Sequence, residues 1–369
     1  MDPEKPSTNP QEIKPINLMV VDDSAFMRFT ITEHVNKTND IRVVGTARDG
    51  KEALELIPRL QPDVITLDVE MPNLNGLDTL REIMNRFPRP VIMFSSLTAE
   101  GTQETIQALT IGAVDFITKP SNKANVVFVM EEAIAKIRQA SHARLGAGKP
   151  RPSPQPVPPQ PTATPSVSGT TGAPKSTRLL LRQDKVVVIG SSTGGPRALN
   201  TVLPGIPGDL PAAYLIVQHM PAGFTRSLAE RLDSLSSIRV REATHGDKME
   251  AGLALMAPGG FHMTVDEEGK ISLNKNPTVH GVRPSVDITM ISAAQIYKNM
   301  TIGVILTGMG RDGANGCGLV HSVGGKVIAE DESTCVVWGM PRSVQEAGYA
   351  DEIVPLPDVS RAIIRAVKG

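Results

Sequence analysis

The sequence predicts an α/β protein in which two globular domains are joined by a proline-rich linker. Short apolar runs alternate with segments of helical periodicity from Ile16 to residue 138, and the same alternation resumes at Lys185. Strands that alternate with helices favour a parallel sheet covered by helices on both faces. Between Pro150 and Pro165, eight of sixteen residues are proline, which is typical of an extended linker.

Five short apolar runs are the predicted strands of the first domain. They are Leu18–Val21, Val43–Gly45, Val64–Leu67, Val91–Phe94 and Phe116–Ile117. The segments between them carry apolar residues at helical spacing, as Ala53, Ile57 and Leu60 do. A continuous apolar run is typical of a strand buried on both faces, so we expect a five-stranded parallel sheet.

The second domain repeats this pattern with five further apolar runs, which we interpret as buried strands. They are Val186–Ile189, Tyr214–Val217, Leu253–Ala257, Ile302–Leu306 and Val327–Ala329. Between His262 and Leu273, apolar residues alternate around Glu268-Gly269, which predicts a hairpin. Ser285 is placed to cap a helix that runs through Ile296. We therefore expect a second layered α/β domain.

Composition and charge set the predicted domain boundaries. We expect a disordered extension over residues 1–15, a first domain over 16–138, a linker over 139–183 and a second domain over 184–369. Residues 1–138 contain 15 basic and 20 acidic residues, and residues 184–369 contain 17 and 19, which gives net charges of −5 and −2. The predicted linker has 6 basic residues and no acidic one, so a basic tether joins two acidic domains.

The composition also disfavours several classes of partner. Aromatic residues make up 3% of the chain, and the acidic second domain shows no helix-turn-helix pattern, so we expect no nucleic-acid partner. No apolar run approaches the roughly 20 residues that span a bilayer, so we expect no membrane insertion. The first residues lack the pattern of a secretory signal, and Cys317 and Cys335 form no disulfide framework or metal motif. These features favour a cytoplasmic protein.

Acidic residues in the first domain sit where the predicted strands end. Asp22 and Asp23 follow the first strand and Asp68 follows the third, while Ser95 and Lys119 follow the fourth and fifth. The carboxyl ends of parallel strands meet at one edge of the sheet, so these groups should converge there. Converging carboxylates favour binding of a hard divalent cation. The ammonium group of Lys119 and the hydroxyl of Ser95 beside them are suited to bind phosphoryl oxygens. A single strand-end Asp would be read as a turn former, but features at four strand ends make that interpretation weak.

The first domain resembles a response-regulator receiver, which implies a flavodoxin-like five-stranded parallel sheet. The segments that carry the resemblance are Val20–Ser24, Thr66–Pro72, Asn75-Gly76 and Thr118–Pro120. The resemblance implies that Asp68 accepts a phosphoryl group and that Asp22 and Asp23 hold Mg²⁺ with it. It further implies that Lys119 contacts the acyl phosphate, and that Ser95 and Phe116 are the hydroxyl and aromatic groups that rearrange on phosphorylation.

In the second domain the first strand runs into a glycine-rich turn with two serines. Gly190-Ser191-Ser192-Thr193-Gly194-Gly195 lets the chain bend sharply and expose one hydroxyl above the sheet, as a nucleophile elbow does. A phosphate-binding loop is the main alternative for such a turn. The Walker pattern is absent because no lysine follows the glycines.

A serine nucleophile needs a base and an acid that orients the base. His219 directly follows the strand Tyr214–Val217, and Asp312 lies in a glycine-rich turn after Ile302–Leu306. A lone histidine is more often structural, but its place at the carboxyl end of a strand favours a catalytic role. The order Ser, His, Asp differs from that of α/β-hydrolases, so that fold is not implied.

These segments, together with Pro258–His262 and Arg283–Asp287, resemble the catalytic domain of the chemotaxis protein-glutamate methylesterases, the CheB family. The resemblance implies a doubly wound α/β domain with Ser192 as nucleophile, His219 as general base and Asp312 as its partner. It places the backbone N–H groups of Thr193 and Met309 in the oxyanion hole. The remaining assignments concern Ser191 as the rival nucleophile and His262 and Arg283 as residues that shape the substrate groove.

The two resemblances together imply a hydrolase activated by phosphorylation. It would hydrolyse glutamate methyl esters on methyl-accepting chemoreceptors, and deamidate receptor glutamines, under the control of a chemotaxis histidine kinase. Mg²⁺ is expected in the receiver and no cofactor in the esterase domain. The alternatives are a catalytically silent receiver scaffold that only competes for phosphate, and an esterase of the same fold that acts on another protein.

Overall fold

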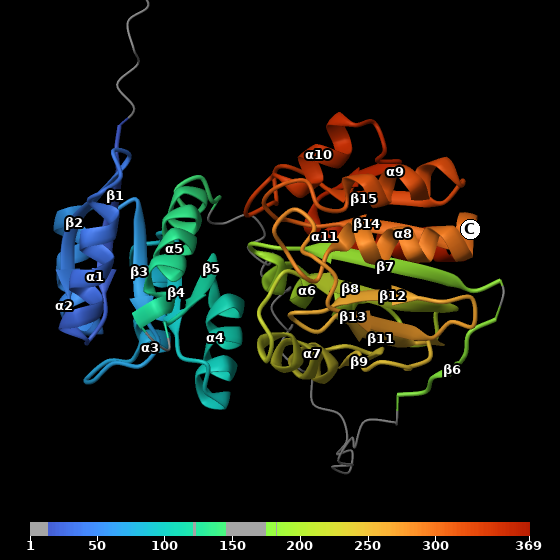
Figure 1. The fold of residues 1–369 in the computed structure, drawn as a ribbon, viewed down its shortest axis with the longest axis horizontal. Helices are drawn as coiled ribbons and strands as arrows, with labels where there is room; N and C mark the ends of the chain where they lie inside the picture. Colours follow the sequence, from blue (N-terminus) through green and yellow to red (C-terminus); the bar gives the residue numbers. More distant parts are fainter. Residues whose placement is uncertain (1–13, 121–122, 145–174, 182) are drawn as a thin grey trace, which may run out of the picture. The chain divides into compact units, whose positions relative to one another are not determined.

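The protein is described by a computed structural model over residues 14–120, 123–144, 175–181 and 183–369. Residues 1–13 of the expected disordered extension and most of the expected linker therefore lie outside the described residues. The described chain forms two compact units, each with its own parallel sheet (Figure 1). No helix within these ranges is long and apolar enough to cross a bilayer.

The first unit contains the five-stranded parallel sheet that the apolar runs predict. Its strands are β1 (Ile16–Val21), β2 (Ile41–Ala47), β3 (Val64–Asp68), β4 (Val91–Ser95) and β5 (Asp115–Thr118). Their order is β2-β1-β3-β4-β5, and every neighbouring pair is parallel. From β1 the chain passes to β2 on one side of the sheet order, and from β3 it passes to β4 on the other side. In such sheets, ligands bind at the carboxyl ends of the two neighbouring strands where this direction changes.

Helices connect successive strands of this sheet, and two more follow its last strand. They are α1 (Ala25–Val35), α2 (Gly50–Leu60), α3 (Gly76–Arg86), α4 (Ala99–Ile111) and α5 (Val126–Ala140), with a short helix η1 (Lys123–Asn125) before α5. Ser24, Asp49 and Asn75 begin the first three helices, because each side chain accepts a backbone N–H of the first turn. Ser24 lies three residues after the end of β1, so strand termination and capping together hold Asp22 and Asp23 in a short loop.

The second unit contains a seven-stranded parallel sheet in the order β16-β15-β14-β7-β8-β11-β9. The strands are β7 (Lys185–Ser191), β8 (Ala212–Gln218), β9 (Arg239–Glu242), β11 (Leu253–Met256), β14 (Thr301–Ile305), β15 (Lys326–Glu330) and β16 (Glu352–Val354). The five predicted strands are confirmed, and the two edge strands β9 and β16 were not predicted. Edge strands face solvent, so their charged residues hide the apolar run that marks a central strand.

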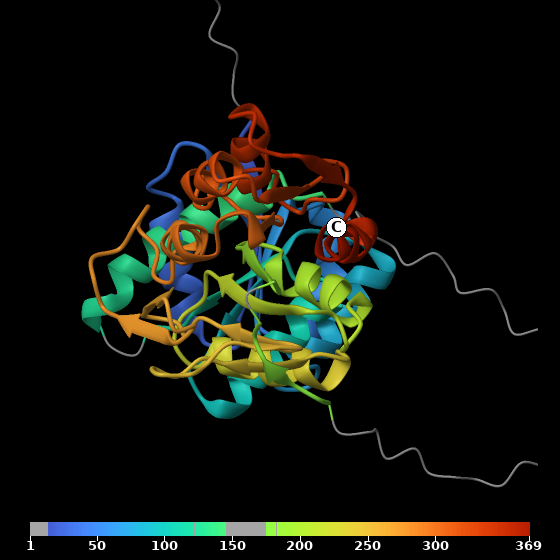
Figure 2. The same cartoon turned by 90° about the vertical axis from the view of Figure 1, so that its right-hand side faces the viewer.

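Helices cover both faces of the second sheet. They are α6 (Gly195–Val202), α7 (Phe224–Leu235), α8 (Val286–Tyr297), α9 (Ala314–Ser322), α10 (Met340–Glu346) and α11 (Leu356–Lys368), with short helices η2 (Leu203–Gly205) and η3 (Lys298–Met300). Helix α8 packs against α9, and α6 packs against α11. Figure 2 shows α8 and α11 on opposite sides of the sheet.

Two small antiparallel pairs complete the second unit. The predicted hairpin is confirmed as β12 (His262–Val265) and β13 (Ile271–Asn274), and Gly269 in its turn has a φ of 72°. The other pair joins β6 (Arg178–Leu179), which lies in the expected linker, to β10 (Glu250–Ala251). The chain preceding Asp184 is therefore already attached to the second unit.

Candidate phosphoacceptor and active sites

Three acidic residues converge at the carboxyl edge of the first sheet. Asp22 follows β1, Asp68 ends β3, and both are buried, while Asp23 is exposed. One carboxylate oxygen from each residue lies within 4.8 Å of the others. Oδ2 of Asp22 and Oδ2 of Asp68 are buried, and among the described residues only the side chain of Lys119 lies beside them as a donor, which suits them to bind a cation. The residues thus fit a hard divalent cation such as Mg²⁺.

Lys119 supplies the positive charge beside these carboxylates. Its Nζ lies 2.6 Å from Oδ2 of Asp68 and 3.3 Å from Oδ2 of Asp22. Burial, followed by the charge of Asp22, raises the pKa of Asp68 to about 6, although Lys119 opposes the shift. Burial also raises the pKa of Asp22. Two carboxylates held in a poorly solvated site favour an added cation, because it offsets their repulsion and their lost hydration.

Ser95 and Phe116 lie on the two neighbouring strands β4 and β5. Ser95 is buried and its hydroxyl donates to the carbonyl of Ser96 at 3.1 Å. The Phe116 ring is 3% exposed, so it already points inward in this structure. Lys136 of α5 lies over this ring, with Nζ 5.2 Å from the centroid.

The glycine-rich turn of the second unit lies between β7 and α6. Ser192 is half-buried and its N–H donates to the carbonyl of Thr307 at 3.0 Å. Gly194 has a φ of 79°, and a Cβ there would lie 2.6 Å from Val336, so only glycine fits this turn. Ser191 is fully buried and its hydroxyl donates to Oε1 of Gln218 at 2.7 Å. Burial and this bond argue against Ser191 as the nucleophile.

His219 and Asp312 meet across the gap between the loops that follow β8 and β14. His219 Nε2 lies 2.8 Å from Oδ2 of Asp312, and the two side chains are 10% and 3% exposed. With Nε2–H as the donor to the carboxylate, Nδ1 is the nitrogen left to accept a proton. The main chain joins this loop to the serine turn, because the His219 N–H donates to the carbonyl of Ser191 at 3.2 Å.

Asp312 is held at the N-terminus of α8 by a set of donors. Its Oδ1 accepts Ser285 Oγ at 2.8 Å and the Asp287 N–H at 3.1 Å, and its Oδ2 accepts the Val286 N–H at 2.7 Å. Burial opposes its ionisation, but His219 and these donors outweigh that effect and hold the pKa of Asp312 below its usual range. Ser285 begins the helix as predicted, yet its own side chain makes no cap bond, because Asp312 supplies the cap.

Thr193 and Met309 lie on the two turns that face each other beside Ser192. The Thr193 carbonyl accepts Thr307 Oγ1 at 3.0 Å, which joins the serine turn to the loop after β14. A Cβ at Gly308 would lie 2.8 Å from Cβ of Ser192, so the residue before Met309 approaches the serine directly. The structure therefore brings the backbone of both turns close to Ser192.

His262 and Arg283 support the loop that precedes α8. His262 is buried, with Nε2 3.0 Å from the carbonyl of Pro277. Arg283 Nη1 donates to the carbonyls of Lys275 and Asn276 at 2.9 and 2.8 Å. Both side chains bind the protein's own backbone and hold this loop in place.

Two polar residues that the sequence did not single out complete the site. Gln218 Nε2 donates to the Ser192 carbonyl at 2.9 Å. Asp287 is buried and its Oδ1 accepts the N–H groups of Gly313 and Gly316 at 3.0 and 2.8 Å, so it caps α9 as Asp312 caps α8. Asp287 lies in the Arg283–Asp287 segment that carries the family resemblance, but its capping role depends on α9 lying against α8, which the sequence does not show.

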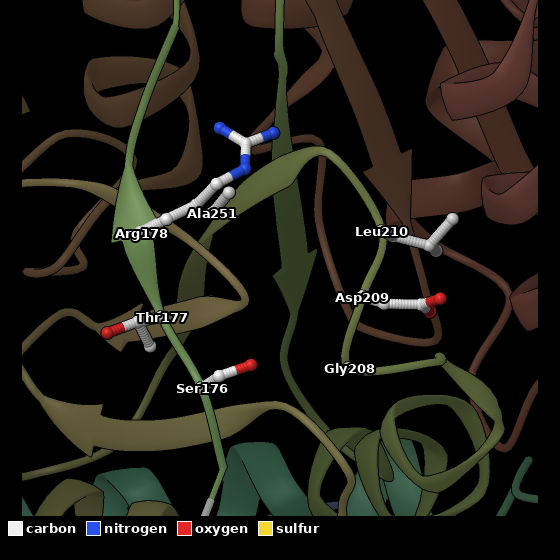
Figure 3. Close-up of a pocket in the computed structure, with 7 residues that line it drawn as sticks. All are labelled: Ser176, Thr177, Arg178, Gly208, Asp209, Leu210 and Ala251. Carbon is white, nitrogen blue, oxygen red and sulfur yellow. The ribbon is translucent and has the colours of Figure 1, made fainter.

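A cavity of about 240 Å³ lies elsewhere in the second unit (Figure 3). It is lined by Ser176, Thr177, Arg178, Gly208, Asp209, Leu210 and Ala251. Gly208–Leu210 precede β8, whereas ligands of parallel sheets bind beyond the carboxyl ends of the strands. No predicted site residue lines this cavity, so it is not the candidate active site.

Both halves of the chain match family models. Residues 18–131 match the response regulator receiver domain, and residues 187–363 match the CheB methylesterase. The two matches cover the two parallel sheets and the loops that carry the acidic cluster, Ser192, His219 and Asp312.

Relatives align over nearly the whole chain. A protein-glutamate methylesterase/protein-glutamine glutaminase of Symbiobacterium thermophilum is 51% identical over 358 residues, which cover 96% of this chain and 98% of the relative. Proteins of the same name from Thermotoga maritima and Pyrococcus horikoshii are 48% and 46% identical and cover 95% and 96% of this chain and 98% and 94% of their own. With this identity across both domains, the chain belongs to the protein-glutamate methylesterase/protein-glutamine glutaminase family.

Proposed function

We propose that the chain is a phosphorylation-activated hydrolase that removes methyl esters from glutamate side chains of methyl-accepting chemoreceptors and deamidates receptor glutamines. Family membership supports the reaction, and one contact carries the assignment of residues. That contact is the 2.8 Å pair of His219 and Asp312 beside the turn of Ser192, at the carboxyl edge of the sheet. A catalytically silent scaffold would have no use for a buried His–Asp pair at this edge.

Ser192 attacks the ester carbonyl, and His219 Nδ1 takes the hydroxyl proton. Asp312 holds the imidazole with Nε2–H bound to its carboxylate and stabilises the imidazolium that forms. The backbone N–H groups of Thr193 and Met309 bind the oxyanion. His219 then returns the proton to the departing methoxide, so methanol leaves and a glutamyl–serine ester remains.

Hydrolysis of the glutamyl–serine ester by water completes the cycle. His219 takes a proton from water, the hydroxide attacks the glutamyl–serine ester, and Ser192 leaves with that proton. With a receptor glutamine as substrate, the same steps release ammonia instead of methanol. None of these steps requires a metal ion in the esterase domain.

The receiver domain, proposed to span residues 16–138, controls this reaction. Asp68 accepts a phosphoryl group from the chemotaxis histidine kinase, and Asp22 and Asp23 hold Mg²⁺ with it. The ion neutralises charge on the phosphoryl oxygens when it is bound. Lys119 contacts the same oxygens, and Ser95 and Phe116 respond to them. The catalytic domain spans residues 184–369, the linker spans 139–183, and the enzyme acts in the cytoplasm.

Methanol release from methylated receptor cytoplasmic domains tests the proposal. Release should rise when a small phosphodonor and Mg²⁺ are added, and Ser192→Ala should abolish it. A fluorophosphonate probe distinguishes the proposed hydrolase from a catalytically silent scaffold, in which Ser192 would stay unlabelled. Labelling of Ser192 without methanol release from receptors would indicate an esterase for another protein.

A further inference from the structure

Thr307 connects the two turns of the proposed active site. Its carbonyl accepts the Ser192 N–H at 3.0 Å, and its Oγ1 donates to the Thr193 carbonyl at 3.0 Å. The same Oγ1 accepts the Val337 N–H at 2.9 Å. Thr307 stands two residues before Met309, so its position determines where both oxyanion N–H groups lie relative to Ser192.

The remaining polar group of Thr307, its N–H, is bound by an acidic side chain. Glu330 ends β15, the strand beside β14, and is fully buried. Its Oε2 accepts the Thr307 N–H at 2.8 Å, while its Oε1 is buried and has no hydrogen-bond partner among the described residues. A buried carboxyl is an unusual way to bind one backbone N–H, because a main-chain carbonyl would do so without charge.

The surroundings of Glu330 hold it close to the boundary between its two protonation states. Burial raises the pKa of Glu330 to about 7, and the Thr307 N–H, the side chains of Thr334 and Cys335 and, least of all, Arg197 of α6 oppose the shift. Thr334 and the Cys335 thiol also face the carboxyl, and burial raises the pKa of Cys335, so that group stays neutral. Arg197 of α6 is the charged group that contributes to this shift, and its effect is the smallest.

We propose that Glu330 is a positioning residue of the hydrolase reaction, whose carboxyl holds Thr307 and thereby aligns Ser192 with the Met309 turn. The inference rests on the proposed roles of Ser192 and Met309. Without an acceptor, the buried Thr307 N–H would be unpaired, and the turn would have to move to find one. An ionised acceptor binds this N–H more strongly than a neutral one. The alignment is therefore firmer when Glu330 is ionised.

Two substitutions in the full-length chain separate positioning from bulk packing. Glu330→Gln keeps the volume and an oxygen acceptor, whereas Glu330→Leu removes the acceptor. We expect Glu330→Leu to lower kcat about tenfold with KM almost unchanged, since the turn shifts but substrate contacts remain. Glu330→Gln should retain kcat within a factor of about three. Glu268→Gln, the same change on the exposed hairpin turn, is the control and should leave kcat unchanged. Equal kcat for the Leu and Gln variants would overturn the inference.

The pH dependence provides a second test that does not need the Leu variant to fold. Gln mimics the protonated acid, so the ratio of wild-type to Glu330→Gln kcat should approach one near pH 6 and rise towards pH 8. A ratio independent of pH would show that ionisation of Glu330 does not act on the turn.

Fluorophosphonate labelling of Ser192 needs no receptor. Its rate should be highest in the wild type, slightly lower in Glu330→Gln and lowest in Glu330→Leu. If the wild type is labelled but releases no methanol, the proposed substrate is wrong while the labelling rates still test Glu330. If the three proteins are labelled at equal rates across this pH range, Glu330 has no positioning role.

Discussion

Asp312→Asn is the substitution whose outcome the geometry constrains most tightly. The carboxylate receives donors at both oxygens, with Ser285 Oγ and the Asp287 N–H at Oδ1 and the Val286 N–H and His219 at Oδ2. An amide has one oxygen and one NH₂ group, so the NH₂ must face a donor in either orientation. Facing His219, it forces the imidazole into the tautomer that cannot accept the serine proton. If the NH₂ group instead takes the place of Oδ1, it lies against the Asp287 N–H, and two donors then face each other.

The two consequences have different magnitudes. An amide partner that imposes the wrong tautomer lowers kcat by about 10⁴-fold in a comparable triad. One buried polar group left unpaired lowers the free energy of unfolding by about 1–3 kcal/mol. Ser285→Ala is the matched control, because it removes one bond to Oδ1 and keeps the carboxylate. It should lower the free energy of unfolding by about 1 kcal/mol with less than a tenfold loss of kcat.

Methanol release and fluorophosphonate labelling measure the first effect, and urea unfolding measures the second. Because His219 and the helix donors lower the native pKa of Asp312, this group stabilises the fold above its unfolded pKa of about 4. That contribution is lost as the pH falls through the lower native pKa, and Asp312→Asn should lack it. An Asp312→Asn enzyme with more than a tenth of wild-type kcat would show that the amide oxygen, and not its NH₂ group, faces His219, and would refute the tautomer argument.

Three further predictions concern the nucleophile and the receiver. Ser192→Ala should abolish fluorophosphonate labelling and methanol release while phosphorylation of Asp68 persists; retained labelling would transfer the role to Ser191. Burial raises the native pKa of Asp68 to about 6, so its contribution to stability is present below about pH 4 and lost as the pH rises through 6. Without Mg²⁺, Asp68→Asn should therefore raise the free energy of unfolding of the receiver at pH 7 by up to about 3 kcal/mol, and Mg²⁺ should stabilise the wild type only. Deletion of residues 1–183 should give a faster esterase than the unphosphorylated full-length chain; an equal rate would mean that the phosphorylated receiver activates by contacts it makes.

The sequence predicted the central strands because they carry continuous apolar runs. Both sheets bury these strands on two faces, so every residue of β3, β4, β8 and β14 is buried and the pattern is unbroken. At the edge of the second sheet, β9 contains Arg239, Arg241 and Glu242, because one side of an edge strand meets solvent. Charge on an edge strand is indistinguishable from charge in a loop when only the sequence is read.

The site residues also differ in how visible they are in the sequence. Ser192, His219 and Asp312 could be singled out because each follows an apolar run and two of them stand in glycine-rich turns. Glu330 also ends a strand, but it lies in an acidic stretch, Glu330-Asp331-Glu332, that reads as an exposed turn. Its burial depends on β15 lying beside β14, a pairing between segments more than twenty residues apart. Sequence spacing does not reveal that pairing.

The environments of Asp68 and Asp312 suit two buried carboxylates to opposite tasks. Asp312 receives a donor set at the start of α8, which lowers its pKa and leaves no oxygen free for a reagent. Asp68 receives fewer donors, the Glu70 N–H at Oδ1 and Lys119 at Oδ2, and it lies beside Asp22, and burial raises its pKa. A saturated carboxylate can only orient its partner, whereas an under-solvated one gains from any cation or phosphoryl group that it binds. The number of donors around each carboxylate, more than its place at a strand end, therefore favours the proposed roles, in which Asp312 orients His219 and Asp68 accepts the phosphoryl group.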